Sequence, residues 1–314
     1  MDAFIIVNIL LLLAGFIFLI KGSDIFVDGA SSIASILKIP AIIVGLTIVA
    51  FGTSTPEAAV SITSSLTGNN AMAVSNIVGS NIFNILIVIG ICALLGDLLM
   101  ERSVLNKDLP FLIGITLLLE ALIFIGGNLT HLEGIVLLII LIVYLTHTVH
   151  VARQPAEANV VEKPKLTLQK SIIFIIIGLV GIVLGGDLVV DNASTIAMAF
   201  GMSETLVGLT IVAIGTSLPE LVTSVTALKK GENQLVIGNV IGSNTFNILF
   251  ILGASSAITN IPVDQSMLTD IGFMIAVTIL CFIFGKTQEK YDKKEGIILV
   301  ALFVIYMAFS IIRN

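Results

Sequence analysis

Long hydrophobic runs alternate with short polar segments along the whole chain. The runs are about 17 to 25 residues, which is enough for a helix to cross about 30 Å of hydrocarbon, and the period-two alternation of a membrane β-barrel is absent. The pattern predicts an all-α integral membrane protein with ten transmembrane helices. The predicted spans are 3–20, continuing as a tilted helix to about 36, and then 40–66, 72–95, 109–127, 132–149, 171–200, 204–228, 234–257, 267–285 and 295–312.

The amino-acid composition favours the same class. Of 314 residues, 57% are hydrophobic and only 11% are charged, and the mean hydropathy is +1.12. This apolar content is too high for a soluble domain of this size, so a soluble protein with a large helical core is not favoured. Cys92 and Cys281 lie inside apolar runs, which favours core packing for both. We expect a monomer in a lipid bilayer, with no cofactor and no nucleic-acid partner.

A polar segment divides the chain into two halves. It predicts a first five-helix repeat over 1–150, a linker over 151–170 and a second five-helix repeat over 171–314. Lys and Arg collect on the cytoplasmic side of membrane proteins. With the N-terminus outside, all 15 basic residues except Arg313 fall inside. The pattern predicts a multi-pass protein of the cell membrane, with both termini outside and the linker in the cytoplasm.

One polar motif occurs in each half. Gly45-Leu-Thr-Ile-Val-Ala-Phe-Gly-Thr-Ser-Thr-Pro-Glu57 returns 163 residues later as Gly208-Leu-Thr-Ile-Val-Ala-Ile-Gly-Thr-Ser-Leu-Pro-Glu220, within similar core motifs at 45–90 and 208–253. Because each repeat has an odd number of spans, the second half should enter the membrane upside down relative to the first. The sequence therefore predicts two inverted repeats whose motifs meet near the membrane midplane.

The duplicated motif places a proline, a carboxylate and hydroxyls at membrane depth. Pro56 and Pro219 have no amide hydrogen, so each should break its helix, the second or the seventh span, and free backbone carbonyls. Oxygen ligands without thiol or imidazole suit Na⁺ and Ca²⁺. The alternatives are an ordinary proline kink and a protonated structural acid at Glu57 and Glu220. Duplication and the high cost of burying a carboxyl group favour a cation site.

A second duplicated motif offers further oxygens. Gly79-Ser-Asn-Ile-Phe-Asn84 and Gly242-Ser-Asn-Thr-Phe-Asn247 place Ser80 and Asn84 on one helix face, and Ser243 and Asn247 on another. All four can offer oxygens to a central ion. Four other asparagines face elsewhere on these helices and are expected to bond between helices: Asn76, Asn81, Asn239 and Asn244.

Two acidic pairs also repeat, Asp24 with Asp28 and Asp187 with Asp191. Each pair is spaced i, i+4 on a helix and so presents both carboxylates on one face. The pairs either line an ion access path or make caps and interfacial contacts, and the second alternative is favoured.

Gly-Thr-Ser-x-Pro-Glu in each half, followed by Gly-Ser-Asn-x-Phe-Asn, resembles the two alpha repeats of the calcium/cation antiporter superfamily, and specifically its sodium/calcium exchanger branch. The resemblance covers both halves. The chain is similar to a compact prokaryotic-type member without a large regulatory domain. It implies Glu57 and Glu220 as central acidic ligands, and backbone carbonyls of Ala50 and Ala213 at flanking sodium sites. The hydroxyl ligands that it implies are Thr53, Ser54, Ser80, Thr216, Ser217 and Ser243.

The resemblance implies exchange of Na⁺ for Ca²⁺ by alternating access, with net charge movement. A proton-coupled cation antiporter is the alternative, but the proton/calcium branch resembles Gly-Asn-x-x-Glu at the position of Gly-Thr-Ser-x-Pro-Glu. Some relatives, including potassium-dependent exchangers, carry Asp where this chain has Asn247, so no potassium requirement is expected. An intramembrane hydrolase is not favoured, because no His lies mid-span to activate a serine.

Overall fold

The computed structural model describes residues 2–68, 70–152, 164–202, 207–263 and 265–313. Most of the predicted linker, residues 153–163, lies outside the described residues. The elements of the first half are α1 (Asp2–Leu37), α2 (Ala41–Val44), η1 (Gly45–Val49), α3 (Ala50–Thr53), α4 (Thr55–Leu66), α5 (Asn70–Phe83), η2 (Asn84–Val88), α6 (Ile89–Leu95), β1 (Leu98–Leu99), η3 (Val104–Asp108), α7 (Leu109–Gly126), β2 (Asn128–Leu129) and α8 (His131–Ala152), where η marks a π-helical segment.

The second half repeats much of this order. Its described elements are α9 (Leu168–Ala199), η4 (Gly208–Val212), α11 (Ala213–Gly215), α12 (Leu218–Lys229), α13 (Asn233–Phe246), η5 (Asn247–Leu252), α14 (Gly253–Ile258), β3 (Ile261–Pro262), α15 (Gln265–Gln288), β4 (Lys290–Tyr291) and α16 (Lys293–Arg313).

The chain is an all-helical membrane protein. Within the described residues, eight helices are long and apolar enough to cross a membrane, and Ala41–Thr53 with Thr55–Leu66 forms one further candidate that bends by 51°. The predicted span 204–228 begins outside the described residues and continues as η4, α11 and α12. The count of ten spans therefore stays a prediction, as does the role of Pro56 in the bend.

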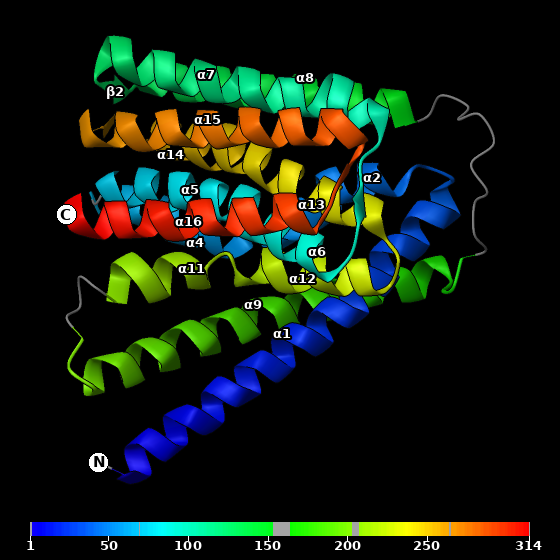
Figure 1. The fold of residues 1–314 in the computed structure, drawn as a ribbon, viewed down its shortest axis with the longest axis horizontal. Coiled ribbons are helices and arrows are strands. Elements are labelled where there is room, and N and C mark those ends of the chain that lie inside the picture. The colour runs from blue at the N-terminus through cyan, green and yellow to red at the C-terminus, as the bar shows by residue number, and fades with distance from the viewer. Residues whose placement is uncertain (1, 69, 153–163, 203–206, 264, 314) are drawn as a thin grey trace.

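Helices α1 and α9 lie side by side along one edge of the bundle, and α7 and α8 lie near the opposite edge (Figure 1). The segments Met72–Leu95 and Asn233–Ile258 are mostly buried in the centre, whereas α1 is mostly exposed. Large apolar side chains such as Leu10 and Ile17 cover the exposed surface of α1. In a membrane this surface would face lipid, and the polar segments would lie in the centre.

Glycines allow α1 and α9 to approach closely. A Cβ atom added to Gly22 would lie 2.8 Å from the amide nitrogen of Ile182 and 2.9 Å from the carbonyl oxygen of Gly178. A Cβ added to Gly185 would lie 2.8 Å from the carbonyl oxygen of Gly15. The two backbones therefore pack directly against each other, as small residues permit in membrane helices.

Four two-residue strands were not expected from the sequence. The antiparallel pairs are β1 with β4 and β2 with β3, so each pair joins a loop of the first half to a loop of the second. Two residues are too short to show the alternating pattern of a strand, and their partners are distant in sequence.

We predict that replacing Gly22 by Ala destabilises the protein by about 1–3 kcal/mol, because the new methyl group must push the α1 and α9 backbones apart. Thermal unfolding of the purified protein in detergent measures the effect. Gly114→Ala in α7 is the control, since a Cβ there would meet no atom of the described residues within 4 Å. Equal melting temperatures for the two variants would contradict the close packing.

Candidate cation-binding site

Two glutamates occupy the centre of the bundle. Glu57 lies in the first turn of α4, and Glu220 lies in the first turn of α12. Each follows a break between short helices, at Ser54 and at Ser217 respectively. Both side chains are completely buried. The positive end of each helix dipole favours a carboxylate at this position.

Serines from both halves bind each glutamate. The Ser217 hydroxyl donates to Glu57 Oε1 at 3.2 Å, and the Ser80 hydroxyl donates to the same oxygen at 3.1 Å. Ser54 donates to Glu220 Oε1 at 2.9 Å. The structure therefore places the serine of each broken segment on the glutamate of the other half.

Ser243 completes this group by donating to Glu220 Oε1 at 3.4 Å, as its counterpart Ser80 does to Glu57. The hydroxyl oxygens of Ser80 and Ser217 also lie 2.8 Å from each other, within hydrogen-bond distance. The structure thus brings together six of the candidate residues that the sequence indicated: Glu57, Glu220, Ser54, Ser217, Ser80 and Ser243.

Several buried polar atoms have no hydrogen-bond partner among the described residues, and four of them are oxygens of the candidate site: Glu57 Oε2, Glu220 Oε2, Asn84 Oδ1 and Asn247 Oδ1. Buried polar groups are usually satisfied, so such atoms require an explanation. All four belong to candidate ligands, and all are acceptors. Their chemistry suits a hard cation.

The asparagines hold the two central helices together. Asn81 and Asn244 each donate to the other's backbone carbonyl, at 3.3 and 3.1 Å, which confirms the expected bonds between helices. Asn84 donates to Asn244 Oδ1 at 3.1 Å, and Asn247 donates to Asn81 Oδ1 at 2.9 Å. These bonds occupy the amide nitrogens of Asn84 and Asn247 and leave their oxygens as acceptors.

Thr53 and Thr216 lie beside this centre. Thr53 donates to Asn239 Oδ1 at 3.0 Å, and Thr216 donates to Asn76 Oδ1 at 3.4 Å. The sequence indicated Asn239 and Asn76 only as interhelical contacts, although their duplication was visible. The structure places them as the side chains that orient the two threonine hydroxyls.

The amides of Ser54 and Ser217, which follow the two carbonyls implied for flanking sites, differ in their acceptors. The Ala50 carbonyl accepts the Ser54 amide at 3.0 Å and lies 3.5 Å from the Ser243 hydroxyl. At the position equivalent to Ser54, the Ser217 amide donates to the Ile214 carbonyl at 3.1 Å. The two halves therefore carry equivalent serines at this position, but the backbone hydrogen bonds of these serines differ.

Neutral oxygens would dominate any cation shell at this centre. Nowhere in the described part of the chain do three or more His, Cys, Asp or Glu side chains gather in a geometry suited to a metal ion. A cation between Glu57 and Glu220 would have two carboxylates and otherwise hydroxyl, amide and carbonyl oxygens. Such a shell suits Ca²⁺ or Na⁺ better than Zn²⁺.

Comparison with known proteins decides the family. A family model described as sodium/calcium exchanger protein matches residues 7–149 and matches again at residues 170–312. The chain belongs to the sodium/calcium exchanger family. The putative antiporter CaxA of Alkalimonas amylolytica is 39% identical, over 96% of this chain and 98% of the relative. The sodium/calcium exchanger MaX1 of Methanosarcina acetivorans is 32% identical, over 96% and 98%.

A solved structure supports the same assignment. The sodium-calcium exchanger NCX_Mj, soaked with Na⁺ and Sr²⁺, superimposes with a TM-score of 0.86 at 31% identity, over 97% of this chain and 99% of that one. The family and its relatives are named as exchangers and antiporters, which are transporters and not enzymes.

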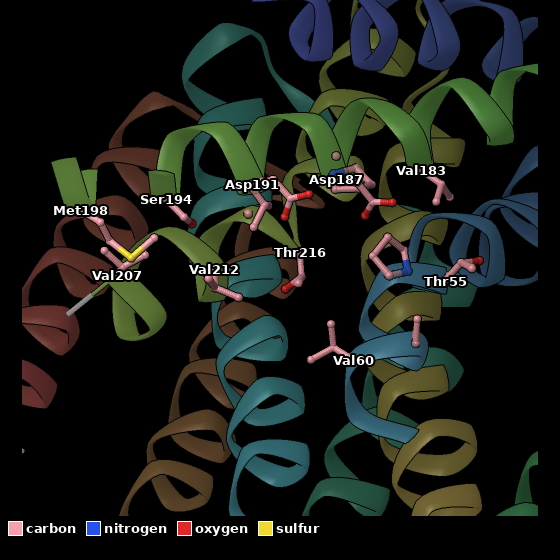
Figure 2. Close-up of a pocket in the computed structure, with 16 residues that line it drawn as sticks. Thr55, Val60, Val183, Asp187, Asp191, Ser194, Met198, Val207, Val212 and Thr216 are labelled. Atoms are coloured by element: carbon pink, nitrogen blue, oxygen red, sulfur yellow. The ribbon is translucent and has the colours of Figure 1, made fainter. Parts of the chain in front are cut away.

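A cavity of about 510 Å³ reaches the candidate ligand Thr216 of this exchanger-family chain. Pro56 and Pro219 line it, so it lies next to both broken segments. Asp187 and Asp191 point from α9 into the cavity, above Thr216 (Figure 2). The structure places this pair at the wall of a cavity, whereas the sequence favoured caps or interfacial contacts for it.

The other acidic pair makes the interfacial contact that the sequence did favour. The Lys230 ammonium lies 2.7 Å from Asp24 Oδ1 and 2.8 Å from Asp28 Oδ1. Lys230 was missed as a functional candidate, because no lysine occupies the equivalent position 67 in the first half.

We predict that Asn239→Ala lowers the stability of this family member by about 1–3 kcal/mol. The substitution removes the acceptor of Thr53 and the amide that donates to the Glu220 carbonyl and the Ser224 hydroxyl. Thermal unfolding in detergent measures the loss. The exposed Ser75→Ala, which removes only a bond within its own helix, is the control. Matching melting temperatures would show that the Asn239 bonds do not stabilise the fold.

Proposed function

We propose that this protein exchanges Na⁺ for Ca²⁺ across a membrane by alternating access. The observation that carries this proposal is the pair of buried glutamates, each bound by serines of both halves and each with one unpartnered carboxylate oxygen. Family membership and the names of the relatives support the choice of ions.

Ca²⁺ binds between Glu57 and Glu220, whose two negative charges neutralise it. Na⁺ competes for overlapping oxygens, because both ions prefer hard ligands. The Ala50 and Ala213 carbonyls serve flanking sodium sites. The remaining ligands come from the hydroxyls and amides of the two motifs: Thr53, Ser54, Ser80, Asn84, Thr216, Ser217, Ser243 and Asn247.

The two halves act as inverted five-helix repeats, 1–150 and 171–314, joined by a cytoplasmic linker. The double match of the family model and the paired hydrogen bonds support this arrangement. Helices α1 and α9 slide together against the other helices and expose the site to either side in turn. Their glycine contacts pack the two backbones directly against each other, which supports their movement as one unit.

The chain is a monomer of the cell membrane with both termini outside. Exchange of more than two Na⁺ for each Ca²⁺ moves net charge, so the membrane potential alters its rate. Transport needs no potassium, because the neutral Asn247 adds no third charge to the site.

Calcium uptake into proteoliposomes tests this function. Vesicles loaded with Na⁺ are compared with vesicles loaded with K⁺ or choline at equal pH, with and without external K⁺. We expect uptake only with internal Na⁺, unaffected by external K⁺. Equal uptake from every load would exclude sodium coupling. Uptake that survives removal of sodium but is lost when a pH gradient is dissipated would establish the proton-coupled alternative.

We predict that Glu57→Gln and Glu220→Gln each reduce sodium-driven calcium uptake below about a tenth of the original rate, because each removes a charged ligand without changing the shape of the side chain. Glu289→Gln is the control, since this carboxylate pairs with Arg102 at the surface. Thermal unfolding verifies that all three variants fold. Substantial calcium flux in either site variant would refute its role as a central ligand.

A further inference from the structure

The two halves differ at one matched interface. Directly after α12, Lys230 binds α1 through three oxygens: the carbonyl of Asp24 at 2.7 Å and the carboxylates of Asp24 and Asp28. The side chain of Lys230 is only 20% exposed. Nearer the centre, the buried hydroxyls of Ser23 and Thr223 lie 3.1 Å apart and join the same two helices. Helix α1 is thus tied to α12 at two levels.

The equivalent interface, offset by 163 residues, lies between α9 and α4 and lacks both ties. Thr67 replaces the lysine, and Gly186 and Val60 replace the two hydroxyl residues. The acidic pair is kept, as Asp187 and Asp191. Here the structure has the cavity of about 510 Å³, lined by Gly186, Val60 and both carboxylates (Figure 2).

The central helix α13 is also tightly packed. On the side of α1, a Cβ added to Gly242 of α13 would lie 2.7 Å from the Ala50 Cβ and 2.8 Å from the Leu46 carbonyl oxygen. The first broken segment therefore lies in direct contact with α13.

We propose that Lys230 is a latch: it ties α1 to α12, keeps the counterpart of the cavity closed, and must release Asp24 and Asp28 before the site opens to the other side. This inference rests on the alternating access proposed above. In the described part of the chain, the polar contacts of the Lys230 side chain are with Asp24 and Asp28, and neither is a candidate ligand. Lys230 therefore acts as a positioning residue. Its partly exposed position suits a reversible ion pair, which water can replace when the helices separate.

The asymmetry explains why only one half needs the lysine. Alternating access requires two states of similar free energy, and a tie present in one state alone shifts their populations. Asp187 and Asp191 cannot form such a tie with Thr67, so their carboxylates remain at the cavity wall. Losing Lys230 should therefore favour the state in which the counterpart of the cavity is open.

Matched cysteine reporters test the latch. Val190 lines the cavity, and its counterpart Val27 is 1% exposed on α1. Val27→Cys and Val190→Cys are made separately in protein with Lys230→Gln and in protein with the original lysine. The rate of maleimide labelling is measured in detergent, where both sides are accessible and transport is not needed. The two native cysteines are buried and give a low background.

We expect Lys230→Gln to raise the labelling rate at position 27 about fivefold, as a modest population shift would, without raising the rate at position 190. Lys229→Gln, which removes an exposed charge next in sequence, should change neither rate. Lys230→Arg should preserve the slow labelling at position 27. Asp28→Asn weakens the same ion pair from α1 and provides the test if Lys230→Gln does not fold.

An unchanged rate at position 27 in both Lys230→Gln and Asp28→Asn would overturn the latch. Equal acceleration at positions 27 and 190 would also overturn it, because that result indicates general loosening of the protein. The proteoliposome assay is read separately: absence of sodium-driven uptake in the original protein refutes the proposed exchange, while the labelling rates still report whether Lys230 holds α1.

Discussion

Two carboxylates buried at the centre of a membrane protein impose the main constraint on this structure. A carboxylate in such surroundings must receive hydrogen bonds or a cation, because desolvation is costly. Glu57 and Glu220 each receive hydroxyl donors from both halves of the chain. Neither half alone provides all the hydroxyl donors of its own glutamate. The arrangement therefore forms only when the two halves pack together.

The surrounding helices make this docking possible. The glycine faces of α13 and the first broken segment bring backbones into direct contact, and the asparagines of α5 and α13 bond across the centre. π-Helical segments occur at matching positions, beginning at Gly45 and Gly208 and at Asn84 and Asn247. Such segments are frequent at functional sites, where they alter the direction of nearby side chains.

Duplication gives the protein two equivalent interfaces, α1 with α12 and α9 with α4. The structure shows the first closely packed and the second beside a cavity. Around α1, polar contacts and tight packing leave little space. Around α9, the same acidic pair borders a cavity next to Thr216. A transporter that alternates between two sides needs this kind of inequality, because a fully symmetric arrangement would treat both sides alike.

The sequence by itself determined the membrane class, most of the helix positions and the two buried acids. Long apolar runs set the helices, and the repeated Glu57 and Glu220 identified the buried acids, because both signals are local or repeat at a fixed offset. Only the tertiary structure decided that Ser217 meets Glu57 and that Ser54 meets Glu220. It also separated Asp24 and Asp28 from Asp187 and Asp191, which share the same i, i+4 spacing. One pair binds Lys230, about 200 residues away in the chain, and the other lines a cavity, because partners so distant in sequence are chosen by packing and not by local pattern.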